Sequence, residues 1–93
     1  MDFEWDPQKA ASNPKKHKVS FAEAVTVFGD RLSITVPDPD HSVGEDRQIT
    51  IGMSDRSRSL MVAYLERGER IRIMSARSLT KAERKAYEEA NGS

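Results

Sequence analysis

The chain has 93 residues, 37% apolar and 32% charged, which fits one globular domain with a lean core. It contains no cysteine, which excludes disulfide frameworks and thiolate zinc sites. The N-terminus is acidic and carries Pro7, unlike a signal peptide, and no apolar run approaches the length that crosses a bilayer. We therefore expect a soluble, cytoplasmic protein.

The net charge of zero conceals an uneven distribution along the chain. Residues 1–46 carry 5 Lys and Arg against 9 Asp and Glu, whereas residues 47–93 carry 10 against 6. Eight of the nine arginines lie at or after position 47. Arginine binds phosphate through a planar fork of donors, so the second half could form an anion-binding surface. Composition alone favours the simpler interpretation, a mixed surface whose charges interleave after folding.

The first third of the chain predicts one short strand and two helices. The alternation in FEW (3–5) is typical of a strand, and Asp6 before Pro7 is a strong helix start. This helix should run toward position 17, but Pro14 predicts a kink, or a break with Asn13 as a second N-cap.

A second helix is marked by the capping box of Ser20 and Glu23. Apolar residues then recur at helical spacing and predict a buried stripe: Phe21, Ala24, Val25 and Phe28. Gly29 predicts that the helix ends in a left-handed residue.

After position 29 the pattern changes from helical to alternating, which predicts strands. Apolar residues alternate within 32–36, 49–53 and 70–74, whereas 60–65 is apolar throughout. The segment PDPDHSVGED (37–46) reads as a polar loop, and a tight turn precedes the last strand.

Thr80 and Glu83 form a second capping box and open a final helix that ends near Ala90, with few apolar residues for docking. Sequential strands joined by short loops pair antiparallel, and two adjacent helices cover one sheet face. The predicted fold class is α+β, a single domain over residues 1–93. Its antiparallel sheet has two N-terminal helices packed on one face, and a C-terminal helix follows.

Three arginines near the last strand are candidates for binding an anion. If the isoleucines of this strand face the helices, Arg70 and Arg72 project from the opposite face, and Arg77 follows where the strand ends. A strand holds an arginine rigidly, which suits stabilisation of a transition state. The alternative is a solvated cation or an ion pair with Glu66 or Glu69. That alternative is favoured for Arg70, and the two interpretations are level for Arg72.

Arg47 has the same parity as Ile49 and Ile51, so it should lie on the apolar face of its strand or just beyond the edge. An arginine in that place needs a partner, and Glu45 or Asp46 could serve. A structural ion pair is therefore the favoured role.

The first predicted helix carries a polar stripe. Lys9, Asn13 and Lys16 lie at i, i+4 and i+7, with His17 beside them. Such a stripe could lie on the rim of the open sheet beside Arg72, where histidine is the usual acid–base group at neutral pH. A solvated helix face is the alternative, and it is what most lysine stripes are.

No cofactor is predicted. The acidic residues and His41 of loop 37–46 fit no calcium loop, and the sequence has no phosphate loop, dinucleotide fingerprint or Ser–His–Asp arrangement. The scattered Arg, Lys and His residues are what RNA cleavage without a metal needs: a base for the 2′-OH, cations for the phosphate and an acid for the leaving 5′-oxygen. Any anion-binding surface would have the same composition.

Three separated segments resemble one known family. FEWDPQKAASNPKKHKVSFAEAVTVFGD (3–30) matches a pattern near FEWDxxKxxxNxxKHGVSFxEAxxVFxD, and DHSVGEDRQITIG (40–52) continues the match. IRIMSARSLTKAERKAY (71–87) is similar to RIISARxAxxxERxxY. These are motifs of the BrnT family, toxins of type II toxin–antitoxin modules. Lys18 stands where the pattern has glycine, which predicts either a left-handed lysine or a different turn.

The resemblance implies the fold of RelE-like ribonucleases and a metal-independent endoribonuclease that cleaves RNA and arrests growth. It also implies a hetero-oligomer with a BrnA-type antitoxin, a ribbon-helix-helix protein through which the complex binds promoter DNA. The rival interpretation is a non-catalytic subunit whose arginine face docks an acidic antitoxin segment or helps the complex hold DNA. No membrane association is expected.

The residues at family motif positions are Lys9, Asn13, Lys16, His17, Glu45, Arg47, Arg72, Ser75, Arg77, Glu83, Arg84 and Tyr87. We predict that His17 acts as base or acid with Lys9 or Lys16 assisting, and that Arg72 and Arg77 stabilise the scissile phosphate. Three residues are predicted to contact RNA, the last by stacking on a base: Arg47, Asn13 and Tyr87. Three others are candidates for structural or antitoxin contacts: Glu45, Glu83 and Arg84.

Overall fold

The computed structural model describes residues 2–38 and 46–92. The elements in chain order are β1 (Asp2–Trp5), α1 (Pro7–His17), α2 (Phe21–Thr26), the 3-10 turn η1 (Val27–Gly29), β2 (Ile34–Pro37), β3 (Arg47–Met53), β4 (Ser59–Arg67), β5 (Arg70–Ser78) and α3 (Lys81–Gly92). This order confirms the predicted α+β class. Within the described residues, no helix is long and apolar enough to cross a membrane.

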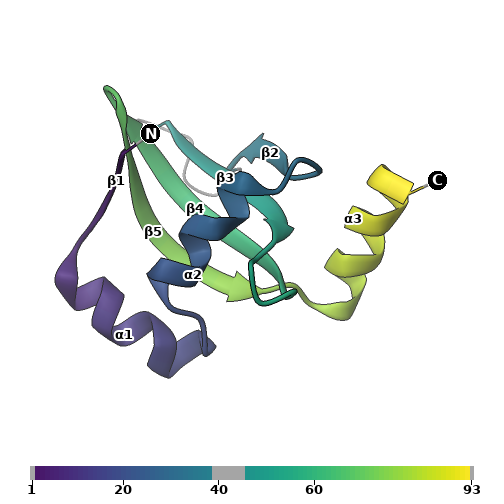
Figure 1. Ribbon diagram of the computed structural model, residues 1–93, viewed down its shortest axis with the longest axis horizontal. Helices are drawn as coiled ribbons and strands as arrows, with labels where there is room; N and C mark the ends of the chain where they lie inside the picture. Colours follow the sequence, from purple (N-terminus) through teal and green to yellow (C-terminus); the bar gives the residue numbers. More distant parts are fainter. Residues whose placement is uncertain (1, 39–45, 93) are drawn as a thin grey trace.

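The strands form one sheet in the order β1-β5-β4-β3-β2 (Figure 1). The pairings β2–β3, β3–β4 and β4–β5 are antiparallel, as predicted for strands joined by short loops. The first strand differs, because β1 lies parallel to β5, with Asp2 opposite Arg70 and Trp5 opposite Ile73. The sheet is therefore largely antiparallel with one parallel pair. β1 covers β5 only as far as Ile73, so from Met74 onward β5 forms the edge of the sheet on that side.

The core lies between α2 and one face of the sheet, while α1 packs beside β5 (Figure 1). Its largest fully buried apolar side chains come from the helical layer, including the α1–α2 connection, and from β4 and β5: Val19, Phe21, Val27, Leu60, Val62 and Ile73. Complete burial of such a side chain is worth roughly 1.5–3 kcal/mol. We name the sheet surface turned toward α2 the core face and the opposite surface the second face.

Of the two alternatives predicted at Pro14, the break is wrong, and so is the prediction of a left-handed Gly29. α1 continues through Pro14 to His17, so Asn13 lies inside the helix and does not cap a second one. The helix ends at Lys18, whose backbone N–H donates to the Pro14 carbonyl at 2.9 Å and whose φ is 61°, so the left-handed lysine is the alternative that holds. Gly29 is not left-handed, because α2 passes into the tighter turn of η1.

The orientation of β3 is opposite to the one expected from its sequence. Alternation predicts that the apolar residues of this strand face the core, but they face away from it. Thr50 and Gly52 turn toward the core, and Thr50 is only 2% exposed. Ile49, Ile51 and Arg47 consequently lie on the second face. Arg47 shares a face with these two isoleucines, as predicted, but that face is turned away from α2.

Candidate active site

Arg72 and Arg77 share one face of the sheet, the second face, because β5 contains a β-bulge between them. Leu65 of β4 lies opposite Arg72 and Met61 lies opposite Arg77, and the register slips by one residue at Met74. Without the bulge, two residues five positions apart would point to opposite faces of the sheet. Arg72 thus projects away from the helices, as alternation predicts. Arg77 lies within the strand rather than beyond its end.

Each of these arginines is held by a carboxylate from another element. Arg72 donates from Nη1 to Oε2 of Glu4 in β1 at 2.8 Å. Arg77 donates from Nη1 and Nη2 to the two carboxylate oxygens of Glu83 in α3, at 2.8 and 2.9 Å. The partner of Arg72 is therefore Glu4 of β1, and neither Glu66 nor Glu69, the two carboxylates that the sequence suggested for an ion pair. The two ion pairs point toward opposite ends of the face, one to β1 and one to α3.

Both carboxylates are stabilised in their charged form. The hydrogen bond from Arg72 lowers the pKa of Glu4. Hydrogen bonds from Arg77 and from the Thr80 backbone lower the pKa of Glu83 to about 2. Glu83 and Thr80 also form the predicted capping box, since each side chain accepts from the other residue's backbone N–H. A phosphate that binds both terminal nitrogens of Arg77 must therefore displace Glu83, whereas Arg72 donates to Glu4 from Nη1 alone.

Two small residues lie between the arginines. Ser75 of β5 is opposite Ala63 of β4, midway between the pairs Met61–Arg77 and Leu65–Arg72. Ser75 is exposed, so its hydroxyl is open to solvent on the second face. Small side chains at this place would let a phosphate approach the sheet between two guanidinium groups.

Asn13 fixes α1 against the part of β5 that β1 leaves uncovered. Its Oδ1 accepts from the Ala76 N–H at 3.2 Å, and its Nδ2 donates to the carbonyls of Ala76 and Val19, both at 2.8 Å. The amide thus binds both backbone groups of a residue on a strand edge, as a neighbouring strand would. Asn13 is only 5% exposed, so it is an anchor for the helix rather than an exposed RNA contact.

Lys9, Lys16 and His17 are exposed and lie about one helical turn from Asn13, in either direction. Between these three and either Arg72 or Arg77, the described part of the chain shows no hydrogen bond or ion pair. The anchor nevertheless places the stripe beside the free edge of β5. Asn13 itself contacts Ala76, the residue before Arg77 in that strand.

The other predicted site residues lie around this centre. Tyr87 of α3 is half-buried and donates from its hydroxyl to Asp30 Oδ2 at 3.1 Å, and burial raises the pKa of Tyr87. Arg47 is half-buried on the second face and Arg84 is exposed on α3. Glu45 belongs to segment 39–45 and lies outside the described residues. Across residues 2–38 and 46–90, no three His, Asp or Glu side chains are grouped so that they could hold a metal ion.

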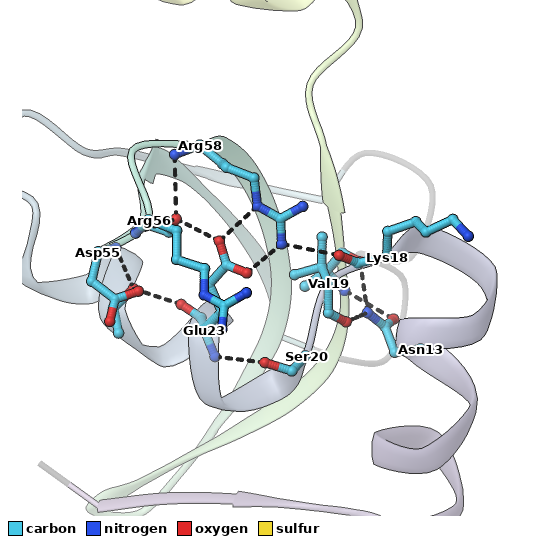
Figure 2. A network of polar contacts seen from close by, with 11 residues as sticks. Asn13, Lys18, Val19, Ser20, Glu23, Asp55, Arg56 and Arg58 are labelled. Carbon is cyan, nitrogen blue, oxygen red and sulfur yellow. Dashed lines mark hydrogen bonds and ion pairs between the residues drawn. The ribbon is translucent and has the colours of Figure 1, made fainter.

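A further ion pair that was not predicted joins Glu23 and Arg58 (Figure 2). Glu23 is 6% exposed and accepts from Nε and Nη2 of Arg58 and from Oγ of Ser54, and the hydrogen bond from Arg58 lowers the pKa of Glu23. Arg58 also donates to the Lys18 carbonyl at 2.9 Å. Ser20 caps α2 by accepting from the Glu23 N–H, as predicted. The network ties the α1–α2 connection, which follows His17, to the β3–β4 turn.

Comparison with known proteins agrees with this geometry. A family model described as the ribonuclease toxin, BrnT, of type II toxin-antitoxin systems matches residues 5–83. The 1.1 Å crystal structure of the Brucella abortus ribonuclease toxin BrnT has a TM-score of 0.69 and 24% identity, over 87% of this chain and 99% of that chain, so the fold is shared. A search of curated proteins gave no match. The chain therefore belongs to the BrnT family, the ribonuclease toxins of type II toxin–antitoxin systems.

Proposed function

We propose that the protein is a metal-independent endoribonuclease that cleaves RNA in the cytoplasm and arrests growth. The observation that carries the proposal is the placement of Arg72 and Arg77 on one sheet face, on either side of exposed Ser75. Asn13 anchors α1 one residue from Arg77, which brings a second set of cationic side chains to the same strand edge. Family membership supports the same activity.

In the proposed reaction, the scissile phosphate lies over Ser75. Arg72 and Arg77 turn from their carboxylates toward the phosphoryl oxygens and stabilise the charge that gathers there as the 2′-oxygen attacks. The base removes the 2′-OH proton and the acid protonates the leaving 5′-oxygen, which leaves a 2′,3′-cyclic phosphate and a 5′-hydroxyl. His17 takes one of these two roles, and Lys9 or Lys16 assists.

The surrounding residues are assigned supporting roles. Arg47 contributes positive charge on the second face, and the ring of Tyr87 stacks on a base. Asn13 positions α1 without touching RNA, because its amide is already bound to Val19 and Ala76.

The proposed partner is a BrnA-type ribbon-helix-helix antitoxin, which neutralises the toxin and lets the complex bind promoter DNA. Glu45, Glu83 and Arg84 are candidate contacts. A second candidate function is a non-catalytic subunit that only docks the antitoxin. The apolar side chains of Ile49 and Ile51 favour it, because they lie half-buried on the same face as the arginines and could pack against a protein.

Growth assays separate the two functions. Expression of the wild-type chain should arrest growth, and the ribbon-helix-helix protein expected in the neighbouring reading frame should restore it. Arg72→Ala and His17→Ala should each relieve the arrest while the fold and antitoxin binding are kept. Lys15→Gln, on the same helix as His17, is the matched control and should remain toxic. If both alanine variants stay fully toxic, the assigned site is wrong. A wild-type chain that binds the antitoxin but neither arrests growth nor cuts RNA supports the second function.

A further inference from the structure

A second group of arginines lies at the β4–β5 turn, away from Ser75. The Glu4 carboxylate lies 2.8 Å from Arg72 Nη1, 3.5 Å from Arg70 Nη1 and 3.8 Å from Arg67 Nη1. We name these four residues the Glu4 cluster. One carboxylate faces three guanidinium groups, and only Arg72 holds it at close hydrogen-bonding distance. Two of the three cations are therefore only loosely compensated.

The fold itself does not require the two loosely held arginines. Arg67 and Arg70 lie directly opposite each other in the β4–β5 register, and like charges in that position destabilise a strand pair. Arg72 lies opposite Glu4 in the β1–β5 register, so this single pair already ties β1 to the sheet. The side chains of Arg67 and Arg70 are 60% and 66% exposed. Exposed like charges that destabilise the fold are typical of a binding site.

The surroundings indicate which ligand would fit. A shallow pocket at this turn is lined by charged side chains and one glycine: Glu4, Glu66, Arg67, Gly68 and Arg70. No apolar anchor of the kind that dominates protein interfaces lines it. Gly68 has a φ of 63° and no atom within 4 Å of the position a Cβ would take, so a ligand can approach the turn closely. Two guanidinium forks lie beside the carboxylates of Glu4 and Glu66 in a lining without an apolar side chain, and their planar donors favour a phosphate of a nucleic acid over a protein segment.

We propose that Arg67 and Arg70 form a phosphate-binding site for RNA that is separate from the scissile position. The inference rests on the proposed function, because it takes RNA as the ligand. Arg67 is four residues along β4 from Ala63, which lies opposite Ser75, a distance of about 13 Å at about 3.3 Å per residue. A stacked strand advances about 3.4 Å per nucleotide, so the site holds a phosphate about four nucleotides from the cleaved one.

The site therefore makes binding depend on the length of the RNA. The three guanidinium groups of the cluster can bind two phosphates in addition to the Glu4 carboxylate. Arg72 binds the phosphate at the scissile position, and Arg67 with Arg70 binds the phosphate further along the strand. A dinucleotide has a single internucleotide phosphate and cannot occupy both places, whereas an RNA of twelve nucleotides spans them in either direction.

The test measures binding of labelled 2′-O-methyl RNA, which lacks the attacking hydroxyl, by fluorescence anisotropy at several salt concentrations. Arg67→Gln/Arg70→Gln should bind the twelve-nucleotide RNA about tenfold more weakly at low salt, with a slope of log K against log salt that is smaller by about 0.7, for the one lost phosphate contact. The dinucleotide should lose less than twofold. Lys15→Gln/Arg56→Gln changes the net charge equally on other exposed surfaces and is the matched control.

The outcomes separate this inference from the proposed function. Wild-type affinity in the double variant, or an equal loss in the control variant, overturns the inference. An unchanged affinity for RNA with a lost affinity for the antitoxin also overturns it and makes the cluster a protein-docking site. Cleavage of ordinary RNA is measured in parallel. Length-dependent binding without any cleavage would refute the proposed ribonuclease while the phosphate site stands.

Discussion

The side-chain amide of Asn13 makes the two hydrogen bonds to Ala76 that a neighbouring strand would make. Sixty-three positions separate the two residues in the chain, yet this contact joins α1 to β5 beyond the end of β1. It also sets where Lys9, Lys16 and His17 lie relative to the strand that carries Arg77. The geometry of the proposed site therefore depends on one buried amide.

Replacing Asn13 should loosen both the fold and the site. Asn13→Ala leaves the Ala76 N–H and two carbonyls without their partner, so the free energy of unfolding should fall by about 1–3 kcal/mol in urea titrations. Asn13→Asp keeps an acceptor for the N–H but loses both donated hydrogen bonds, so it should also destabilise. Ser12→Ala is the control, since Ser12 bonds only to the Lys9 carbonyl at 3.3 Å. Equal stability of Asn13→Ala and Ser12→Ala would contradict the anchoring role.

Lys18 offers a simple stabilising substitution. An L-residue in the left-handed region costs roughly 1–2 kcal/mol, whereas glycine adopts it freely but loses more chain entropy on folding. Lys18→Gly should therefore raise the free energy of unfolding by about 0.5–1 kcal/mol. Lys15→Gly, inside α1, should lower it by about 1 kcal/mol. A destabilising effect of Lys18→Gly would show that the lysine side chain contributes more than its backbone strain costs.

The ion pair of Glu23 and Arg58 should be costly to break (Figure 2). Arg58→Ala removes the main cation beside a carboxylate that is only 4% exposed, and we expect a loss of about 3 kcal/mol in the free energy of unfolding. Glu23→Gln/Arg58→Ala removes the buried charge as well, so it should be more stable than Arg58→Ala alone. If the double variant is less stable than the single one, the unpaired carboxylate is not the cause of the loss.

The contact between α3 and β5 should depend on acid pH. The pKa of Glu83 is about 2 in the folded protein against an ordinary 4.5. A lowered pKa stabilises the docked helix fully above about 4.5, and that stabilisation is lost as the pH falls toward 2. NMR signals of the Tyr87 ring should report undocking of α3 over this window.

Glu83→Gln provides the control for this pH effect. The variant cannot form the charged pair with Arg77, so its α3 amides should exchange faster with solvent already at neutral pH. The titration between pH 4.5 and 2 should then be smaller than in the wild type. An unchanged acid titration in Glu83→Gln would assign the effect to another carboxylate.

Local signals in the sequence predicted most of the fold. The capping box at Thr80 formed in full, because its two hydrogen bonds join residues three positions apart. At Ser20 only the serine half formed, because the Glu23 carboxylate accepts from Arg58 and Ser54 instead. The orientation of β3 was not predictable from alternation, because Thr50 is buried through a hydrogen bond to the Thr35 hydroxyl at 3.0 Å. A polar residue can occupy the core when a distant strand supplies its partner, and the sequence does not reveal that partner.

Only part of the site was predicted, because its remaining contacts also join residues that are distant in the chain. Strand parity placed Arg72 on the outer face, but the bulge at Met74, which brings Arg77 to that face, depends on pairing with β4. The carboxylates that hold the two arginines come from β1 and α3, and neither contact follows from spacing. The sequence assigned Glu23 to a capping box, and its burial and its pairing with Arg58, 35 positions away, follow only from the fold.

The most direct measurement is the cleavage of end-labelled RNA by the purified protein with EDTA present. We predict endonucleolytic products with 5′-hydroxyl ends. Removal of a charge-stabilising donor by Arg77→Ala should lower kcat by about 10²–10³. The contrary results are equally clear. Each of three results would contradict a metal-independent ribonuclease built on these two arginines. The first is no cleavage at high enzyme excess, and the second is cleavage that EDTA abolishes. The third is a wild-type rate in both Arg72→Ala and Arg77→Ala.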